Sequence, residues 1–100
     1  MIFLKYNFLK QNGKLYIKNE NIVLGYIEFF DKNNIISINK VVVEESFRGQ
    51  GIANKLMEQI VNIADEKNKK INPVCSFAVS WFEKNKNFSH VLVKFNKFSR

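Results

Sequence analysis

The chain has 100 residues and a mass of 11.8 kDa, with 46% hydrophobic and 25% charged residues. These values are ordinary for a globular protein, and they exclude a long disordered chain. We expect one domain over residues 1–100, without a membrane span, because no apolar run approaches roughly 20 residues. The single cysteine, Cys75, and single histidine, His90, provide neither an internal disulfide nor the ligands of a zinc site. We therefore expect a cytoplasmic protein without metal chemistry.

The net charge of +7 first suggests a nucleic-acid partner, because a basic surface attracts phosphate. Lysines outnumber arginines 14 to 2, however, whereas phosphate and base recognition favours arginine. The positive charge also lies at the two ends of the chain: residues 1–18 and 84–100 contain no acidic residue. We expect mainly solvated lysines and no nucleic-acid partner. The alternative is a basic terminal patch that meets an acidic partner.

The first half of the chain predicts a three-stranded antiparallel meander. Residues 15–18, 22–30 and 35–43 are rich in apolar and β-branched side chains, and short polar turns separate them. Residues 1–13 and 94–100 are apolar and basic without a clear period. We assign no element to these two ends.

The second half predicts a long helix, a short strand, a second helix and a last strand. From residue 52 onward, apolar residues recur at helical spacing, and we expect this helix to end near Asn68. Residues 71–75 predict an edge or interrupted strand, because they contain Pro73. Residues 90–93 predict a last strand. Ser76 is the expected N-cap of the second helix, and its core-facing residues are expected to be Phe77, Val79, Trp81 and Phe82.

A glycine-rich turn lies between the third predicted strand and the long helix. Such a turn can bind phosphate, because glycine allows close approach and the first amides of the helix point at the anion. A P-loop would need Lys after Gly51, where Ile52 stands, and a dinucleotide fold would need glycine in place of Asn54. The pattern Gln/Arg-x-x-Gly-x-Gly/Ala, the acetyl-CoA turn of the GNAT acetyltransferases, is satisfied by residues 48–53. A turn that only joins strand to helix is the alternative.

A second match lies downstream in Pro73-Val74-Cys75-Ser76-Phe77. Two upstream segments belong to the same pattern: the valine and two acidic residues from Val43 to Glu45, and the turn Arg48-Gly49-Gln50-Gly51-Ile52-Ala53. With these motifs the chain resembles the small stand-alone GNAT-like proteins of the YjdJ type over residues 14–93. The resemblance implies an α+β, GNAT-like acyl-CoA N-acyltransferase fold, with a mostly antiparallel sheet of about five strands and two helices. It also implies acetyl-CoA as cofactor and an amine as acceptor.

In that fold the strands before and after the long helix splay apart, so that backbone groups can pair with pantetheine. The resemblance implies the cofactor-binding set Val42, Val43, Arg48, Gly49, Gln50, Gly51, Ile52, Ala53 and Cys75. Cys75 would face the acyl group, where it protonates the departing CoA thiolate or carries the acetyl group itself. A small buried hydrophobe is the alternative role of this cysteine. Glu45 is the expected base, with a solvated carboxylate as alternative, and Arg48 either meets a phosphate or braces the turn.

Two departures from the family pattern bear on catalysis. Lys40-Val41 stands where members carry His-Thr, and Asn85-Lys86-Asn87-Phe88 stands where they carry His-Pro-Glu-Tyr. A proton relay through these histidines is therefore absent. Two alternatives to an N-acetyltransferase stay open: an acetyl-CoA-binding module with little activity, and a basic interaction protein. The short turn at residues 19–21 predicts an open acceptor side. An open side favours a macromolecular amine or a site completed by a partner, and the sequence does not identify the acceptor or the oligomeric state.

Overall fold

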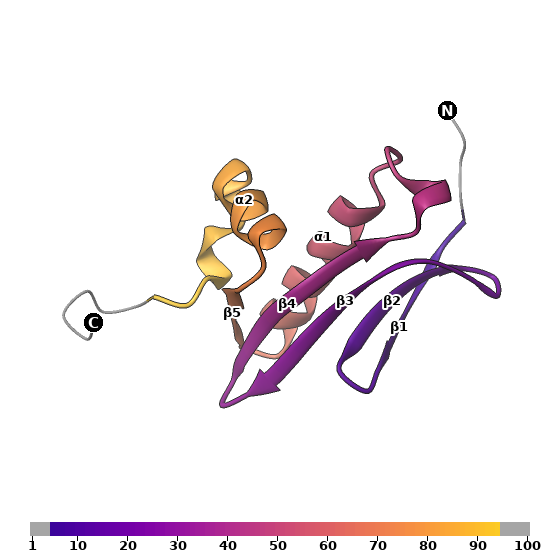
Figure 1. Cartoon of the computed structure of the whole chain (residues 1–100). Helices are drawn as coiled ribbons and strands as arrows, with labels where there is room; N and C mark the ends of the chain where they lie inside the picture. Colours follow the sequence, from indigo (N-terminus) through magenta and orange to yellow (C-terminus); the bar gives the residue numbers. More distant parts are fainter. Residues whose placement is uncertain (1–4, 95–100) are drawn as a thin grey trace.

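The computed structural model describes residues 5–94 and forms one five-stranded sheet, with the strands side by side in chain order (Figure 1). The strands are β1 (Asn7–Gln11), β2 (Lys14–Asn19), β3 (Ile22–Lys32), β4 (Ile35–Val43) and β5 (Lys70–Pro73). The helices are α1 (Ile52–Glu66) and α2 (Ser76–Lys84), and two 3-10 segments are η1 (Glu45–Phe47) and η2 (Lys86–Val91).

Strands β1 to β4 are an antiparallel meander, and β5 pairs parallel to β4. The three predicted strands of the meander are confirmed as β2, β3 and β4. Strand β1 is an addition, joined to β2 by a turn in which Asn12 and Gly13 have φ of 52° and 76°. Two successive positive φ values are those of the tight hairpin turn that Asn-Gly favours. Helix α1 makes the crossover between the parallel strands and passes behind β3 and β4 in Figure 1.

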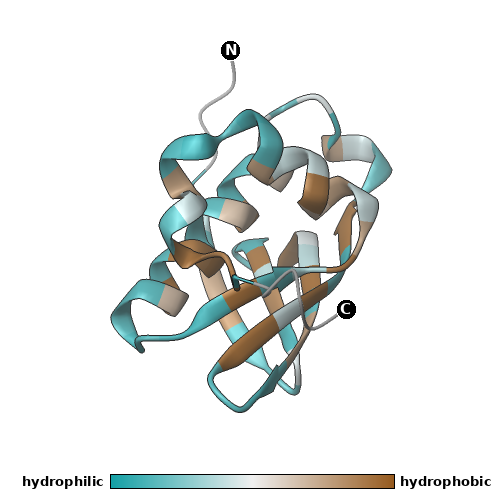
Figure 2. Cartoon of the chain, turned by 90° about the vertical axis from the view of Figure 1, so that its left-hand side faces the viewer, coloured by the Kyte–Doolittle hydropathy of each residue, from teal (hydrophilic) through white to brown (hydrophobic). Residues whose placement is uncertain are grey.

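The hydrophobic core lies between α1 and one face of the sheet, which we call the inner face. The alternation of side chains along each strand sends every second residue to this face. Figure 2 shows the resulting pattern, with brown segments in strands and helices and teal in the hairpin turns. The buried residues are Leu15, Ile17, Leu24, Ile27, Phe29, Ile36, Ile38, Ile52, Leu56, Met57, Ile60, Val61, Ala64, Ile71, Ala78, Trp81, Phe82 and Val91.

A β-bulge in β4 changes which residues face the core. The register pairs Glu28 with Lys40 but Phe29 with Ile38, so that Asn39 is an extra residue without a partner in β3. Before the bulge, Ile38 is buried, and after it Val41 packs against the core. The bulge therefore shifts the alternation by one residue, and the last part of β4 reaches the start of α1 with Val41 and Val43 on its inner side.

The long helix ends where the sequence predicts. Its last residue is Glu66, Lys67 is the C-cap, and Asn68 adopts the left-handed conformation with φ of 56°. Asn tolerates this conformation better than most side chains do, and it ends a helix by releasing the next residues from the helical ladder. Within residues 5–94, neither this helix nor α2 is long and apolar enough to cross a membrane.

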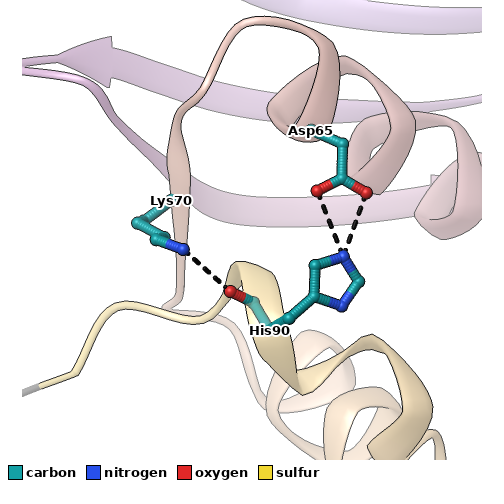
Figure 3. Close-up of polar contacts among 3 residues, drawn as sticks. All are labelled: Asp65, Lys70 and His90. Carbon is teal, nitrogen blue, oxygen red and sulfur yellow. Dashed lines mark hydrogen bonds and ion pairs between the residues drawn. The ribbon is translucent and has the colours of Figure 1, made fainter.

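The prediction of a strand at residues 90–93 is wrong. Residues 86–91 form η2, and only Leu92 makes an isolated parallel bridge to Ile71. Figure 3 shows why the segment is held in this turn: the Nζ of Lys70 donates to the His90 carbonyl oxygen at 2.9 Å, and the His90 ring Nε2 lies 3.0 and 3.1 Å from the carboxylate oxygens of Asp65. Side-chain contacts from β5 and α1 thus outweigh the β-branched composition of the segment. His90 thus makes a structural contact on the surface.

The prediction for α2 is correct in position and partly wrong in detail. The N-cap is Cys75, whose side chain makes no capping hydrogen bond, and Ser76 is the first helical residue. The side chains of Phe77 and Val79 are 42% and 38% exposed, whereas Ala78, Trp81 and Phe82 are buried. The inward face of α2 is the one that carries Ala78, Trp81 and Phe82, which are spaced three and four residues apart. Phe77 and Val79 consequently point away from the core.

Candidate functional site

Strands β4 and β5 separate at Ile38, and we call the gap beyond this point the wedge. The two strands pair only between Ile35–Ile38 and Lys70–Pro73. The carbonyl oxygen of Ile38 accepts the last two hydrogen bonds, from the Val74 and Cys75 amides at 3.0 and 3.1 Å. Beyond them the chain after β5 turns into α2, while β4 continues to Val43 beside β3 alone. Among the described strands, none pairs with this outward edge of β4.

The wedge opens into a cleft of about 430 Å³. Its lining comes from five parts of the chain: the end of β4, the end of η1, the glycine-rich turn, the start of α1 and the first turn of α2. The lining residues are Val41, Val42, Val43, Phe47, Arg48, Gly49, Gly51, Ile52, Ala53, Asn54 and Phe77. Seven of them belong to the cofactor-binding set expected from the sequence: Val42, Val43, Arg48, Gly49, Gly51, Ile52 and Ala53.

The start of α1 gives the cleft a set of backbone donors. Gly51 is the N-cap with φ of 79°, a left-handed conformation that side chains rarely adopt, and no side chain caps the helix. The first helical hydrogen bond runs from the Lys55 amide to the Gly51 carbonyl at 3.1 Å. The amides of residues 52–54 therefore have no acceptor in the preceding turn, and the positive end of the helix dipole lies with them. An added Cβ at Gly51 would have no atom of residues 5–94 within 4 Å, so in this part of the chain the position faces open space.

Arg48 braces the turn. Its Nε donates a hydrogen bond of 3.2 Å to the carbonyl oxygen of Val43, the last residue of β4. The bond joins the end of the strand to the turn that enters α1. The sequence left two roles open for Arg48, contact with a phosphate and bracing of the turn, and this hydrogen bond is a bracing contact.

Cys75 lies at the vertex of the wedge, where β4 and β5 separate. It is half-buried, packs against the core, and precedes α2. The cleft lining reaches Phe77, two residues further on. Gln50 and Glu45 are exposed beside the cleft, Gln50 in the turn and Glu45 in η1. Cys75, Gln50 and Glu45 are thus neighbours of the cleft in the chain without belonging to its lining.

Four further residues line the cleft that the sequence does not predict there: Val41, Phe47, Asn54 and Phe77. Phe77 was expected in the core, and its 42% exposure is the structural sign of a different role. Asn54 had no signal beyond its place in the first turn of the helix. Its Oδ1 accepts a hydrogen bond of 2.7 Å from the Trp81 indole, which links α1 to α2 beside the cleft.

Comparison with known proteins places this arrangement in a family. The GCN5-related N-acetyl-transferase family matches residues 14–91. The solution structure of a GCN5-like protein from Staphylococcus aureus is 33% identical, covers 91% of both chains and has a TM-score of 0.71. No curated protein sequence matches the chain significantly.

Two larger enzymes share the fold at lower identity. The PaiA N-acetyltransferase from Thermoplasma acidophilum, solved with coenzyme A, is 17% identical over 72% of this chain and 48% of that chain, with a TM-score of 0.60. The ribosomal-protein-S18-alanine N-acetyltransferase from Escherichia coli is 10% identical over 78% of this chain and 51% of that chain, with a TM-score of 0.62. The chain thus spans about half the length of these enzymes. Because the family match covers most of the chain, and the S. aureus structure is similar over nearly its whole length, the protein is an acetyltransferase domain of the GCN5-related N-acetyltransferase family.

Proposed function

We propose that the chain transfers an acetyl group from acetyl-CoA to a primary amine, with the cleft between β4 and α1 as the acetyl-CoA site. The observation that carries the proposal is the coincidence of two features in one cleft. The edge of β4 lacks a described strand partner there, and the amides of residues 52–54 lack a helical acceptor. Both are hydrogen-bonding groups that a ligand must satisfy when it excludes water.

The residues of the cleft fit the parts of the cofactor. The amides at the start of α1 suit a pyrophosphate, because they supply donors with the helix dipole behind them. Gly51 leaves open space for the close approach of that group. The backbone of Val42 and Val43 suits the amide groups of pantetheine, and Phe77 supplies an apolar wall on the opposite side. The likeness to a structure solved with coenzyme A supports this assignment.

The chemistry proposed for the side chains follows from their places. Acetyl-CoA supplies an activated thioester when bound. Cys75, at the vertex of the wedge, is the residue that we place nearest the acyl group, where its thiol donates a proton to the leaving sulfur. Glu45, on η1 beside the end of β4, takes the proton from the attacking amine, directly or through water. Positioning of the two reactants accounts for most of the rate.

A module that binds acetyl-CoA with little turnover is the second candidate, and one observation favours it. Lys40 and Asn85 occupy the places of the family histidines. Asn85 also has a structural contact, because its Nδ2 donates to the Trp81 carbonyl oxygen at 2.8 Å at the end of α2. A proton relay through that position is therefore not available.

Mass spectrometry of the protein incubated with acetyl-CoA, with and without a library of primary amines, distinguishes the two candidates. We expect acetylated amine and free CoA in equal amounts, and an acetyl adduct on Cys75 only if this thiol carries the group. Binding of acetyl-CoA by calorimetry with no acetylated product would establish the binding module instead. We place the reaction in the cytoplasm on the sequence grounds given above.

A further inference from the structure

The sheet face opposite α1, which we call the outer face, is open to solvent in the described part of the chain. The side chains on it alternate with the buried ones of β1 to β4. Leu9 and Phe30 are 42% and 58% exposed there, and Tyr16 and Tyr26 are only half-buried. In Figure 1 this face looks toward the viewer, and neither α1 nor α2 crosses in front of it. A ligand of extended shape could therefore lie across it.

One row of the outer face leads directly into the cleft. The register places Leu9 beside Tyr16, Tyr16 beside Tyr26, and Tyr26 beside Val42. The rings of the two tyrosines lie 5.9 Å apart. Val42 is also a lining residue of the cleft. The row thus forms an apolar and aromatic track from the sheet edge at β1 to the proposed acetyl-CoA site.

The charges beside this track are mostly positive. Lys14, Glu28 and Lys40 form the neighbouring row in direct register across β2, β3 and β4. The Nζ of Lys14 lies 5.1 Å from the Tyr26 ring centroid, which confirms that both side chains share the face. At strand positions of β1 to β4, the charged side chains of the outer face are Lys14, Lys18, Lys32, Lys40 and Glu28. Four lysines against one glutamate attract an acidic ligand and repel a polycation.

These observations constrain the acceptor of the proposed reaction. The reaction needs an alkyl amine, which the bases of a nucleic acid do not offer. A polyamine or an aminoglycoside offers amines but is itself a polycation, so the lysines of the outer face disfavour it. We propose that the acceptor is an acidic polypeptide segment, which lies along the row from Leu9 to Val42 and presents a primary amine at the cleft. This inference rests on the proposed function.

The step that follows docking balances without a further reactant. The amine nitrogen forms a bond to the acetyl carbonyl carbon while the carbon–sulfur bond breaks. The nitrogen loses one proton and the departing sulfur gains one, so the products are an amide and a thiol.

The test uses two peptides of equal length with a free N-terminal alanine, one with Asp and Glu residues and one with Asn and Gln at the same positions. Spermidine is the cationic amine. We expect kcat/KM for the acidic peptide to exceed that for the neutral peptide by about tenfold, and spermidine to be the poorest acceptor. The double variant Lys14→Glu, Lys40→Glu should abolish the preference. The matched control is Lys67→Glu, because Lys67 is exposed at the end of α1 and lies outside the outer face. This variant should still prefer the acidic peptide.

A binding measurement separates this inference from the proposed function. The acidic peptide, blocked by N-acetylation, should shift the amide resonances of Leu9, Tyr16 and Tyr26 in an NMR titration, and a single-stranded RNA octamer should not. Shifts without acetylation of any amine would contradict the proposed function and leave the docking surface intact. Acetylation with equal kcat/KM for both peptides, no shifts with the blocked peptide, or shifts with RNA alone would each overturn the inference.

Discussion

The indole Nε1 of Trp81 donates a hydrogen bond of 2.7 Å to the side-chain oxygen of Asn54, and this bond joins α2 to the start of α1. The Trp81 ring is buried, stacks on Phe88 with centroids 5.2 Å apart, and meets Phe82 edge-on at 5.0 Å. Asn54 in turn lines the cleft. The hydrogen bond therefore holds one wall of the cleft against the helix that follows Cys75.

Removal of this hydrogen bond should affect both stability and cofactor affinity. We expect Trp81→Phe and Asn54→Ala each to lower the free energy of unfolding, with a coupling of about 0.5–1.5 kcal/mol between them, because both remove the same bond. The KM for acetyl-CoA should rise more than kcat falls. Denaturant unfolding of the two single variants and the double variant measures the coupling. Additive effects on stability, with an unchanged KM, would show that the bond does not support the cleft.

Gly51→Asn should weaken acetyl-CoA binding by at least about tenfold, or about 1.4 kcal/mol. Asn tolerates the left-handed conformation that Gly51 adopts, with φ of 79°, so the helix start should survive. The new side chain would occupy the open space in which we place the pyrophosphate. Calorimetry measures the affinity. Gly13→Asn is the control, since Gly13 has φ of 76° in the β1–β2 turn, outside the lining of the cleft. Equal affinities for Gly51→Asn and wild type would refute the pyrophosphate site.

Gly25→Ala should destabilise the protein by about 1–3 kcal/mol through overpacking. A Cβ at Gly25 would lie 2.5 Å from the Val42 carbonyl oxygen and 3.4 Å from the Ile52 side chain. The close contact is with the backbone of β4, so β3 and the end of β4 must move apart if Gly25 is replaced. Thermal unfolding, together with acetyl-CoA affinity, tests this. A variant with wild-type stability and affinity would show that the close contact between Gly25 and the backbone of β4 is not needed.

Local signals account for the parts of the fold that could be predicted. The meander has alternating apolar strands between polar turns, and α1 has a strict helical period with Asn68 at its end. Strand β1 was missed, although Asn12-Gly13 is a strong hairpin signal, because the residues before it have no clear alternation. Gly25 within a strand could have indicated the close approach of another backbone.

Tertiary contacts decided the elements that could not be predicted. Residues 90–93 have a strand-like composition, yet contacts from Lys70 and Asp65 to His90 hold the start of this segment in η2. Phe77 lines the cleft and does not pack in the core. An apolar residue of α2 is therefore exposed. Local rules often fail at sites that a ligand completes. The bulge at Asn39, which directs Val42 to the outer face, depends on pairing with β3 and has no local signal.

Cys75→Ala should reduce kcat more than Glu45→Gln does, because the cysteine lies at the vertex of the wedge and the glutamate lies on the exposed η1. A positioned proton donor contributes about 10² to 10⁴ to the rate, and no family histidine replaces it here. Turnover in both variants should be slow with free small amines. A thiol-release assay gives the rates, with Glu66→Gln at the end of α1 as control. Fast turnover that survives Cys75→Ala but collapses in Glu45→Gln would reverse the assigned roles.

An NMR titration of ¹⁵N-labelled protein with acetyl-CoA tests the location of the cofactor site most directly, because each amide reports separately. We expect the largest shifts in two segments, residues 41–43 at the outward edge of β4 and residues 51–54 at the start of α1. The amides of β1 and η2, which lie outside the lining of the cleft, should shift little. Saturable binding with its largest shifts on β1 or η2, or no binding at millimolar acetyl-CoA, would contradict the assignment of the cleft.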